Sequence, residues 1–351
     1  MIDRGHRGCV EAALAHEAGA RTPVNNFAIV TAARSAGMTV DEARWRPEVS
    51  ATVSIDYALK TRSDFVKPIL DSQAPFADLG AEVSFPEDDY GYIRSHLVKD
   101  AEDVDSLAFF DPRAAEECPF FSKIFVEGLE ATAAALPEDL HVCGLSWGPF
   151  TTAGLLMGAE QMLMATFMDR DMVRSLVDKS AGFVLDMQAA MLEAGATVIW
   201  MADPTSSGDM ISPGMFEDLS FGAIKSVMEG AKAASGAPAF LHICGDTTGI
   251  LPMIPDTGTD CFSFDHAVDI AAAKGLAGKR VALMGNIDPV KLIMDGSPEA
   301  VARECARMIG IAGTEGGYVI APGCETPQSS PDANVEAMGR AGTEYWLGNG
   351  R

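Results

Sequence analysis

Basic residues are scarce in this sequence: 26 lysines and arginines stand against 50 aspartates and glutamates, which gives a formal net charge of −24. No block rich in Lys or Arg interrupts this surplus, so nucleic acid and anionic membrane surfaces are not expected as partners. We interpret the acidic surplus as a well-solvated surface. A salt-adapted host and a basic partner are the alternative explanations.

Long apolar runs are lacking as well. No run reaches the roughly 18 residues that span a bilayer. The N-terminal MIDRGHRGCVEAALAHEAGA has no basic region followed by an apolar core, so it is typical of a short amphipathic helix and not of a signal peptide. We therefore expect a cytoplasmic protein. Neither a G-x-G-x-x-G motif nor a P-loop lies between a strand and a helix, which argues against nucleotide binding.

Cysteines are present, but not in a pattern that suits disulfides. Their number is odd and their spacing is scattered, at positions 9, 118, 143, 244, 261, 305 and 324. In a reducing compartment each one is expected to be a free thiol or a metal ligand.

From about residue 138 onward, short apolar runs alternate with amphipathic segments. The candidate strands are 139–145, 197–203, 237–244, 261–265, 280–286 and 316–322. Apolar residues recur at three- and four-residue steps in the candidate helices 172–195, 215–234, 298–313 and about 331–345. This alternation predicts a parallel sheet covered by helices. We expect an α/β fold, a (β/α)₈ TIM barrel, as one domain over residues 1–351. The less regular first 135 residues are interpreted as an N-terminal helical extension and the first barrel elements.

Several of these candidate strands end in a polar or reactive residue. These residues are Asp203, Cys244, Asp265 and Asn286, with Cys324 two residues beyond the last strand. In parallel α/β barrels the chemistry collects at the carboxyl ends of the strands. The five residues are therefore candidates for a functional site.

The pair His242 and Cys244 is the most specific of these signals. Residues i and i+2 of a strand point to the same face, and zinc accepts imidazole nitrogen and thiolate sulfur at about 2.0–2.3 Å. The spacing alone selects nothing, because His141 and Cys143 repeat it, and a buried His beside a Cys is commonly part of a core. What distinguishes the later pair is Cys324, which supplies a third ligand and leaves a fourth position open, as in catalytic zinc sites.

A zinc ion with two thiolate ligands suits particular chemistry. Such a metal lowers the pKa of a substrate thiol, and its soft sulfur ligands keep that sulfur nucleophilic. Methyl transfer to or from the sulfur is then the natural reaction. The same Lewis acid can instead polarise an ether oxygen as a leaving group.

The sequence resembles the uroporphyrinogen decarboxylase superfamily over nearly its whole length. The resemblance is carried by WGPFTTAGLLMG (147–158), MADPTSSGDMISPGMFED (201–218), FLHICGDTTGIL (240–251), VDIAAAKGLAGKRVALMGNIDP (268–289) and APGCETPQSSPDANVEAM (321–338), and more thinly by residues 22–37 and 78–107. It implies a (β/α)₈ barrel.

Two branches of the superfamily can be told apart by their motifs. The decarboxylases have an Arg-rich segment of the type PVWxMRQAGR, where this chain has PVNNFAIVTAAR and keeps only Arg34. They also have a Gly-His-Gly turn, where this chain has Gly323-Cys324-Glu325. The chain is more similar to the zinc-dependent, corrinoid-linked methyltransferases, whose motif implies His242, Cys244 and Cys324 as metal ligands.

The resemblance implies Zn²⁺ and a cobalamin or other corrinoid as cofactors. The corrinoid would be carried by a partner corrinoid protein, because the chain has no Asp-x-His-x-x-Gly motif of its own. The methyl group would move to a thiol such as coenzyme M or from a donor such as an aryl methyl ether, and the direction stays open. The alternative is a tetrapyrrole decarboxylase. A zinc-free corrinoid-binding barrel and a folate-dependent methyltransferase are further rivals, and a homodimer stays open.

Three other residues at strand ends are weaker candidates. Asp203 and Asp265 are the candidate catalytic residues, and Asp203 is also a candidate fourth metal ligand. Asn286 is the candidate cofactor-binding residue. For each of them, capping of a following loop or helix is an equally good interpretation.

Overall fold

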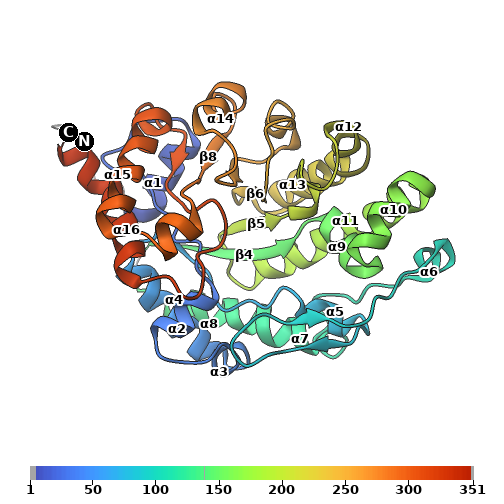
Figure 1. The fold of residues 1–351 in the computed structure, drawn as a ribbon. Helices are drawn as coiled ribbons and strands as arrows, with labels where there is room; N and C mark the ends of the chain where they lie inside the picture. The colour runs from blue at the N-terminus through green and yellow to red at the C-terminus, as the bar shows by residue number, and fades with distance from the viewer. Residues whose placement is uncertain (1–4, 138, 349–351) are drawn as a thin grey trace.

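Seven parallel strands form one curled sheet in the computed structural model, which describes residues 5–137 and 139–348 (Figure 1). In spatial order the strands are β1 (Phe65–Val66), β4 (His141–Trp147), β5 (Val198–Ala202), β6 (Ala239–Ile243), β7 (Cys261–Phe264), β8 (Ala282–Met284) and β9 (Tyr318–Val319). Apart from Trp147, every residue of these strands is buried, as expected for a parallel sheet covered by helices.

A short segment near the N-terminus joins the two edges of this sheet. The backbone nitrogen of Ile320, next to β9, donates to the oxygen of Pro23 at 2.9 Å, and the nitrogen of Asn25 donates to the oxygen of Ile320 at 2.8 Å. On the other side, the nitrogen of Asp64, next to β1, donates to the oxygen of Val24 at 2.7 Å. The sheet is thereby closed into a TIM-barrel-like fold, which confirms the predicted α/β barrel architecture.

Helices cover the outside of the sheet (Figure 1). They include α4 (Pro47–Lys60), α8 (Glu127–Ala135), α9 (Pro149–Met157), α11 (Arg170–Glu193), α13 (Phe221–Ser235), α14 (Ile270–Leu276), α15 (Pro298–Met308) and α16 (Asp332–Gly348). The others are α2 (Val30–Ser35), α3 (Val40–Arg44), α5 (Ala74–Asp78), α6 (Ala101–Ser106), α7 (Pro119–Phe121), α10 (Ala159–Met168) and α12 (Pro213–Met215). A small antiparallel pair, β2 (Val83–Ser84) and β3 (Tyr92–Ile93), lies outside the barrel. No described helix is both long and apolar enough to cross a membrane.

Local signals in the sequence explain where several helices begin. The side chain of Asp169 accepts a hydrogen bond from the nitrogen of Met172 at the start of α11, and Ser297 does the same for Ala300 at the start of α15. Two predicted helices contain π-helical turns, η3 (Phe216–Ser220) before α13 and η6 (Ile309–Gly313) after α15. The predicted boundaries of both helices include these turns.

Helix α1 (Gly5–Leu14) lies at the amino-terminal ends of the barrel strands. The nitrogen of Gly317, just before β9, donates to the oxygen of Ala13, and the nitrogen of Arg7 donates to the oxygen of Asp139, just before β4. Helices α2 to α4 follow the segment that closes the sheet. The predicted N-terminal helical extension is therefore not confirmed as a separate unit.

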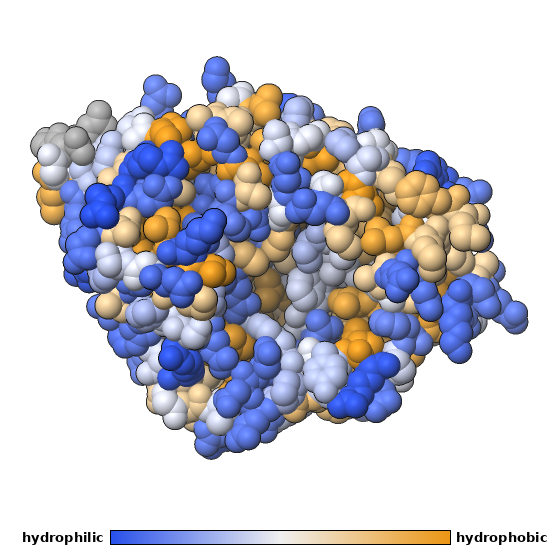
Figure 2. All heavy atoms as spheres, in the orientation of Figure 1, coloured by the Kyte–Doolittle hydropathy of each residue, from blue (hydrophilic) through white to orange (hydrophobic). Residues whose placement is uncertain are grey.

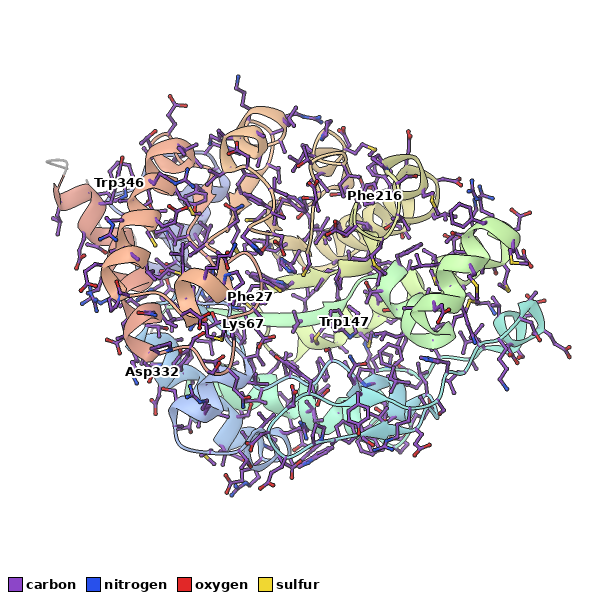
Figure 3. All side chains as sticks on the ribbon, viewed as in Figure 1. Phe27, Lys67, Trp147, Phe216, Asp332 and Trp346 are labelled. Atoms are coloured by element: carbon purple, nitrogen blue, oxygen red, sulfur yellow. The ribbon has the colours of Figure 1, made fainter. Side chains whose placement is uncertain are left out.

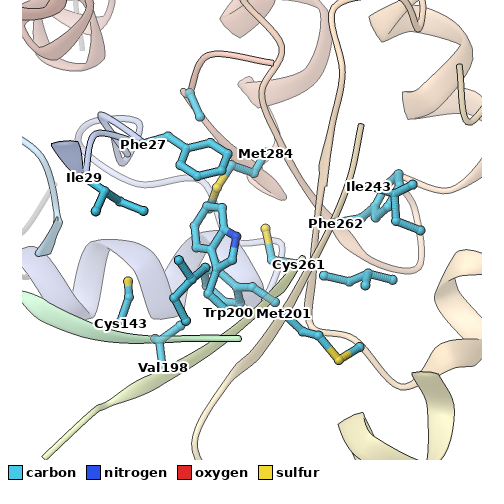
Figure 4. Packing of buried hydrophobic residues seen from close by; sticks show 14 of the residues in the cluster. Phe27, Ile29, Cys143, Val198, Trp200, Met201, Ile243, Cys261, Phe262 and Met284 are labelled. Carbon is cyan, nitrogen blue, oxygen red and sulfur yellow. The ribbon is translucent and has the colours of Figure 1, made fainter. Parts of the chain in front are cut away.

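The barrel interior is built around Trp200, which is fully buried (Figure 4). Its ring centroid lies 4.9 Å from that of Phe27 and 6.0 Å from that of Phe240. The ammonium group of Lys67 lies 5.1 Å from the Trp200 ring and is hydrogen-bonded to the side-chain oxygen of Asn25. Burial lowers the pKa of Lys67 to about 8. The inside of the barrel is thus aromatic, with one buried cation held by the side chain of Asn25 and the ring of Trp200.

His141 is the first residue of β4 and lies at the amino-terminal end of the barrel strands. Its ring stacks on Phe65 with centroids 5.6 Å apart, and its Nδ1 lies 3.1 Å from the hydroxyl of Thr197. The Nε2 atom is buried and without a hydrogen-bond partner. Burial lowers the pKa of His141 to about 4, so the folded protein holds this imidazole neutral.

This histidine is expected to make stability fall on acidification. Between about pH 6.5 and pH 4, His141 is protonated in the unfolded chain but stays neutral in the folded chain. The free energy of unfolding therefore decreases as pH falls. From pH 7 to pH 5 the loss at this one group is about 2 kcal/mol. The His141→Gln variant should lose that increment when urea unfolding is measured at both pH values. An equal pH dependence in the variant and the wild type would contradict the assignment.

Candidate metal centre and the cavity beside it

Three predicted metal ligands meet at the carboxyl ends of β6 and β9. His242 lies in β6, Cys244 follows it directly, and Cys324 lies in the turn after β9. The His242 Nε2 atom is 3.0 Å from the sulfur of Cys244, and the sulfurs of Cys244 and Cys324 are 3.5 Å apart. The potential ligand atoms of all three residues lie within 4.8 Å of one another. The structure therefore brings together residues separated by 80 positions in the sequence.

The imidazole of His242 is oriented by its neighbours. Its Nδ1 lies 2.9 Å from the hydroxyl of Ser263, its register partner on β7, and the ring of Phe27 contacts it edge-on at 5.1 Å and 85°. With Nδ1 engaged by Ser263, Nε2 faces the two sulfurs. A hydrogen bond to the second ring nitrogen is the usual way in which a ligand histidine is fixed.

Removing this hydroxyl should weaken metal binding without removing a ligand. We expect Ser263→Ala to lower the zinc affinity about 10-fold, within the 10- to 100-fold range typical of such orienting groups. Competition with a chelating dye measures the affinity. Ser180→Ala is the matched control, because Ser180 is equally buried but donates to Leu176 in the middle of α11. The same loss of affinity in both variants would refute a specific role for Ser263.

The two thiols differ in their readiness to lose a proton. The hydrogen bond from Cys244, assisted by His242, lowers the pKa of Cys324 below its ordinary value. The same hydrogen bond, with burial, raises the pKa of Cys244. The pair therefore loses its first proton at Cys324. An anionic sulfur beside an imidazole is a donor set suited to a soft or borderline metal ion.

A cavity of about 180 Å³ opens beside these three residues. Its other lining residues are Phe27, Ile29, Ser72, Gln73, Tyr90, Leu145, Ser146, Trp147, Ala202, Pro204 and Glu325. The face shown in Figure 2 is hollowed near its centre, in the region where Figure 3 labels Phe27 and Trp147. The candidate metal centre thus has direct access to a largely apolar space.

One acidic group lies in this lining. The hydroxyl of Tyr90 donates to Glu325 Oε1 at 2.7 Å, and burial raises the pKa of Glu325 to about 7. Tyr90 comes from the less regular first 135 residues, and nothing in the sequence pointed to it. Glu325 follows Cys324 directly, and its proximity to a predicted ligand was the available signal.

Asp203 is buried but does not line the cavity. Its carboxylate accepts hydrogen bonds from the nitrogen and hydroxyl of Thr151, at 2.7 and 2.6 Å, and from the nitrogen of Phe150 at 3.3 Å. It therefore caps the first turn of α9, and burial raises its pKa to about 6. The helix that Asp203 caps precedes it in the chain, whereas the alternative weighed was capping of a following loop or helix. Its catalytic role and its role as a fourth metal ligand stay predictions.

Asp265 and Asn286 lie together beside the candidate metal centre. The Asp265 carboxylate is 2.7 Å from Nδ1 of His266 and accepts from the nitrogen of Ala267. The amide nitrogen of Asn286 donates to the backbone oxygens of Asp265 and Val268 at 2.9 and 2.7 Å. Asn286 faces a separate groove of about 400 Å³, lined also by His266. Both residues shape the loop after β7, and their catalytic and cofactor-binding roles stay predictions.

Comparison with known proteins gives both methyltransferases and decarboxylases. A methylcobamide:CoM methyltransferase of Methanosarcina acetivorans is 27% identical over 250 residues, which cover 71% of this chain and 70% of that protein. A methylated-thiol–coenzyme M methyltransferase of Methanosarcina mazei is 31% identical over 205 residues, covering 58% and 53% respectively. A uroporphyrinogen decarboxylase of Azoarcus sp. is 26% identical over 251 residues, covering 69% and 67%. The matched part of the chain thus spans between 53% and 70% of the length of these proteins.

The fold has a counterpart among solved structures, and a family model covers nearly the whole chain. A methyltransferase from Methanosarcina mazei superposes with a TM-score of 0.84 at 22% identity, covering 97% of this chain and 99% of that one. Residues 8–345 match the model described as uroporphyrinogen decarboxylase (URO-D). The chain belongs to the uroporphyrinogen decarboxylase family, as predicted, and its relatives support the corrinoid methyltransferase branch of that family.

Proposed function

We propose that this protein is a zinc-dependent methyltransferase that moves a methyl group between a corrinoid, carried by a separate protein, and a small substrate. The convergence of His242, Cys244 and Cys324 beside a cavity is the observation that carries the proposal. The methyltransferase class is supported by the relatives of Methanosarcina, whose names specify methylcobamide, methylated thiols and coenzyme M.

The donor set fits zinc on chemical grounds. One imidazole and two thiols are soft to borderline ligands, and three protein ligands beside an open space are typical of a catalytic zinc site. Ser263 holds His242 in the tautomer that leaves Nε2 free, and Cys324 is the thiol that loses its proton first. The bound metal would supply a Lewis acid toward the sulfur or oxygen atom of the substrate.

The chain's own residues would bind the substrate and exclude water. Phe27 and Trp147 line the cavity that receives the small molecule. When a thiol is the acceptor, it would release its proton to solvent and its sulfur lone pair would form the bond to the methyl carbon; the corrinoid would supply the methyl group and keep the electron pair of the bond that breaks. When a methyl ether is the donor, its oxygen would keep the bonding pair and take up a proton, and the reduced corrinoid would supply the electron pair for the new bond to the methyl carbon.

A tetrapyrrole decarboxylase is less well supported. Such an enzyme must bind several carboxylates, and none of the described residues that line the cavity is an arginine or lysine. The decarboxylase relative is 26% identical, against 27% and 31% for the two methyltransferases. The absence of arginine and lysine from the cavity lining, more than these close identities, supports the methyltransferase.

The test is anaerobic absorbance spectroscopy of free methylcobalamin and of cob(I)alamin with the purified protein, with zinc content measured on the same samples. We expect about one zinc per chain and a protein-dependent change of the methyl–cobalt band in the presence of a thiol or a methyl ether. Absence of zinc from protein purified without chelators and supplied with zinc would refute the proposal.

A further inference from the structure

Phe27 has a backbone conformation that aromatic residues rarely adopt. Its φ is 40°, in the left-handed region where a Cβ atom crowds the backbone. In the described part of the chain, the other non-glycine residues with a positive φ are His16 and Arg62. These two residues follow the ends of α1 and α4, where the chain commonly takes this conformation. Phe27 follows no helix, so helix termination does not explain its strain.

Hydrogen bonds on both sides of Phe27 impose this conformation. Its nitrogen donates to Oδ1 of Asn25 at 2.9 Å, and its carbonyl oxygen accepts from the nitrogen of Thr326 at 2.8 Å. The ammonium group of Lys67 donates to the same Oδ1 atom of Asn25. A strained residue persists only where its surroundings over-determine it, and such residues cluster at functional sites.

Lys67 is unfavourable for stability in this position. It is only 3% exposed, and no carboxylate of the described residues forms an ion pair with it. Its partners are Oδ1 of Asn25 and the ring of Trp200, whose centroid lies 5.1 Å from the ammonium nitrogen. Glu325 attracts the ammonium group through space, yet burial still lowers the pKa of Lys67. Burial of a cation without a paired carboxylate opposes folding, so stability does not explain the presence of this lysine.

The ring of Phe27 joins this network to the candidate metal centre. It contacts the imidazole of His242 edge-on, with centroids 5.1 Å apart and planes at 85°, and it packs on Trp200 at 4.9 Å (Figure 4). The hydrogen bond between Ser263 and Nδ1 of His242 fixes which ring nitrogen faces the sulfurs, but it leaves the imidazole free to tilt. The Phe27 ring opposes this tilt because it stands against the imidazole at nearly a right angle.

We propose that Phe27 is a positioning residue for the metal ligand His242, and that Lys67 holds Phe27 in place through Asn25. This inference rests on the proposed function in one respect, which is that His242 binds a metal ion. The strained backbone and the buried cation each oppose folding, and together they fix the direction in which Nε2 of His242 points. A ligand that is already oriented loses less freedom on binding, so the metal affinity is higher.

Binding of Co²⁺ alone to the metal-free protein tests the role of Phe27, because the visible absorption of Co²⁺ depends on its ligands and their geometry. We expect Phe27→Leu to bind Co²⁺ about fivefold more weakly than the wild type, the typical effect of one aromatic edge-on contact, with shifted absorption bands. Phe65→Leu is the matched control, since Phe65 is a buried interior ring that stacks on His141 and not on His242. Wild-type affinity and spectrum in Phe27→Leu, or equal losses in both variants, overturn the inference.

Lys67→Met separates positioning from a purely structural role, because the two roles predict different changes in stability. Loss of a structural residue lowers the urea midpoint of unfolding. We expect the midpoint of Lys67→Met to equal or exceed that of the wild type, while its Co²⁺ absorption shifts in the same direction as that of Phe27→Leu. A lower midpoint with the wild-type Co²⁺ spectrum makes Lys67 a structural residue and overturns its proposed role.

The double variant Phe27→Leu/Lys67→Met tests whether Lys67 acts through Phe27. Both substitutions then remove the same constraint on His242, so the double variant should lose no more Co²⁺ affinity than Phe27→Leu alone. Additive losses of affinity overturn the path from Lys67 through Phe27.

The wild type separates this inference from the proposed function. A wild type that binds neither Co²⁺ nor Zn²⁺ overturns the proposed function and the inference with it. Metal binding and methyl transfer by the wild type, without any change of affinity or spectrum in the variants, keep the proposed function and overturn the inference alone. Weaker and spectrally altered Co²⁺ binding in the variants, without methyl transfer by the wild type, supports the inference and overturns the methyltransferase.

Discussion

Replacement of Cys324 by alanine is expected to abolish zinc binding and methyl transfer together. The variant removes one of the two sulfurs that lie 3.5 Å apart, and with it the thiol that most readily becomes anionic. Loss of a group that merely orients a ligand typically costs 10- to 100-fold in affinity, so loss of the ligand itself should cost more than about 100-fold. Zinc content should fall below about 0.1 per chain.

Thermal unfolding gives a readout that is independent of activity. A metal that binds only the folded protein raises its stability by mass action, so added zinc should raise the unfolding temperature of the wild type but not of Cys324→Ala. Cys305→Ala is the matched control, since Cys305 is a fully buried cysteine on α15 that the proposed site does not use. That variant should keep its zinc. Full zinc content in Cys324→Ala would refute the assignment of this ligand.

Gly339→Ala should cause the largest loss of stability among single-methyl substitutions. Gly339 lies in α16, and a Cβ atom at this position would overlap the backbone oxygen of Thr61 at the end of α4. Backbone atoms cannot rotate away as a side chain can, so the whole of α16 must shift away from the end of α4. Overpacking typically costs 1–3 kcal/mol, and we expect about 3 kcal/mol or more here, measured by urea unfolding.

Gly182→Ala is the same chemical change, but we expect it to raise the free energy of unfolding instead of lowering it. Gly182 is an exposed residue in the middle of α11, and nothing lies within 4 Å of the position of its added Cβ. Alanine should therefore stabilise the helix by about 0.5–1 kcal/mol, because it restricts the unfolded chain more than glycine does. A similar change in the free energy of unfolding for the two substitutions would show that α16 can shift away from α4 at little cost, which would contradict the prediction for Gly339→Ala.

Most of the barrel could be predicted from periodicity after residue 138. The predicted strand 261–265 corresponds to β7, and the predicted helix 172–195 corresponds to α11, with boundaries shifted by one or two residues. The first strand was missed because β1 has only two residues, Phe65 and Val66. Such a short strand forms because it pairs with β4, and two residues are too few to show a periodic pattern in the sequence.

The candidate metal ligands could also be predicted, and the structure shows why the similar pair in β4 is different. His141 begins its strand, whereas His242 lies next to the end of β6. Since Trp147 lies at the level of His242 across β5, His141 lies six residues, or roughly 20 Å, below that level. The sequence located the strand ends only to within a few residues. It therefore could not show that the pair His141 and Cys143 lies far from the carboxyl ends of the strands, whereas the pair His242 and Cys244 lies close to them.

The cavity walls were the least predictable part of the site. Phe27, Gln73 and Tyr90 come from the irregular N-terminal part of the chain, where the backbone follows tertiary contacts and not a period. Whether a loop side chain faces a cavity depends on partners that are distant in sequence. One example is the hydrogen bond from Tyr90 to Glu325, which joins residues 235 positions apart.

The segment around Val24, which closes the sheet by pairing with Ile320 and Asp64, also affects when the barrel can finish folding during translation. The segment around Val24 is synthesised long before Ile320, with which it pairs, and Thr326 donates to the oxygen of Asn26 across a sequence separation of 300 residues. Contacts of such long range form slowly because the entropy of the intervening chain opposes them. Cys324 lies next to these late contacts, so the three residues of the candidate metal centre would come together in a nascent chain only when the barrel closes.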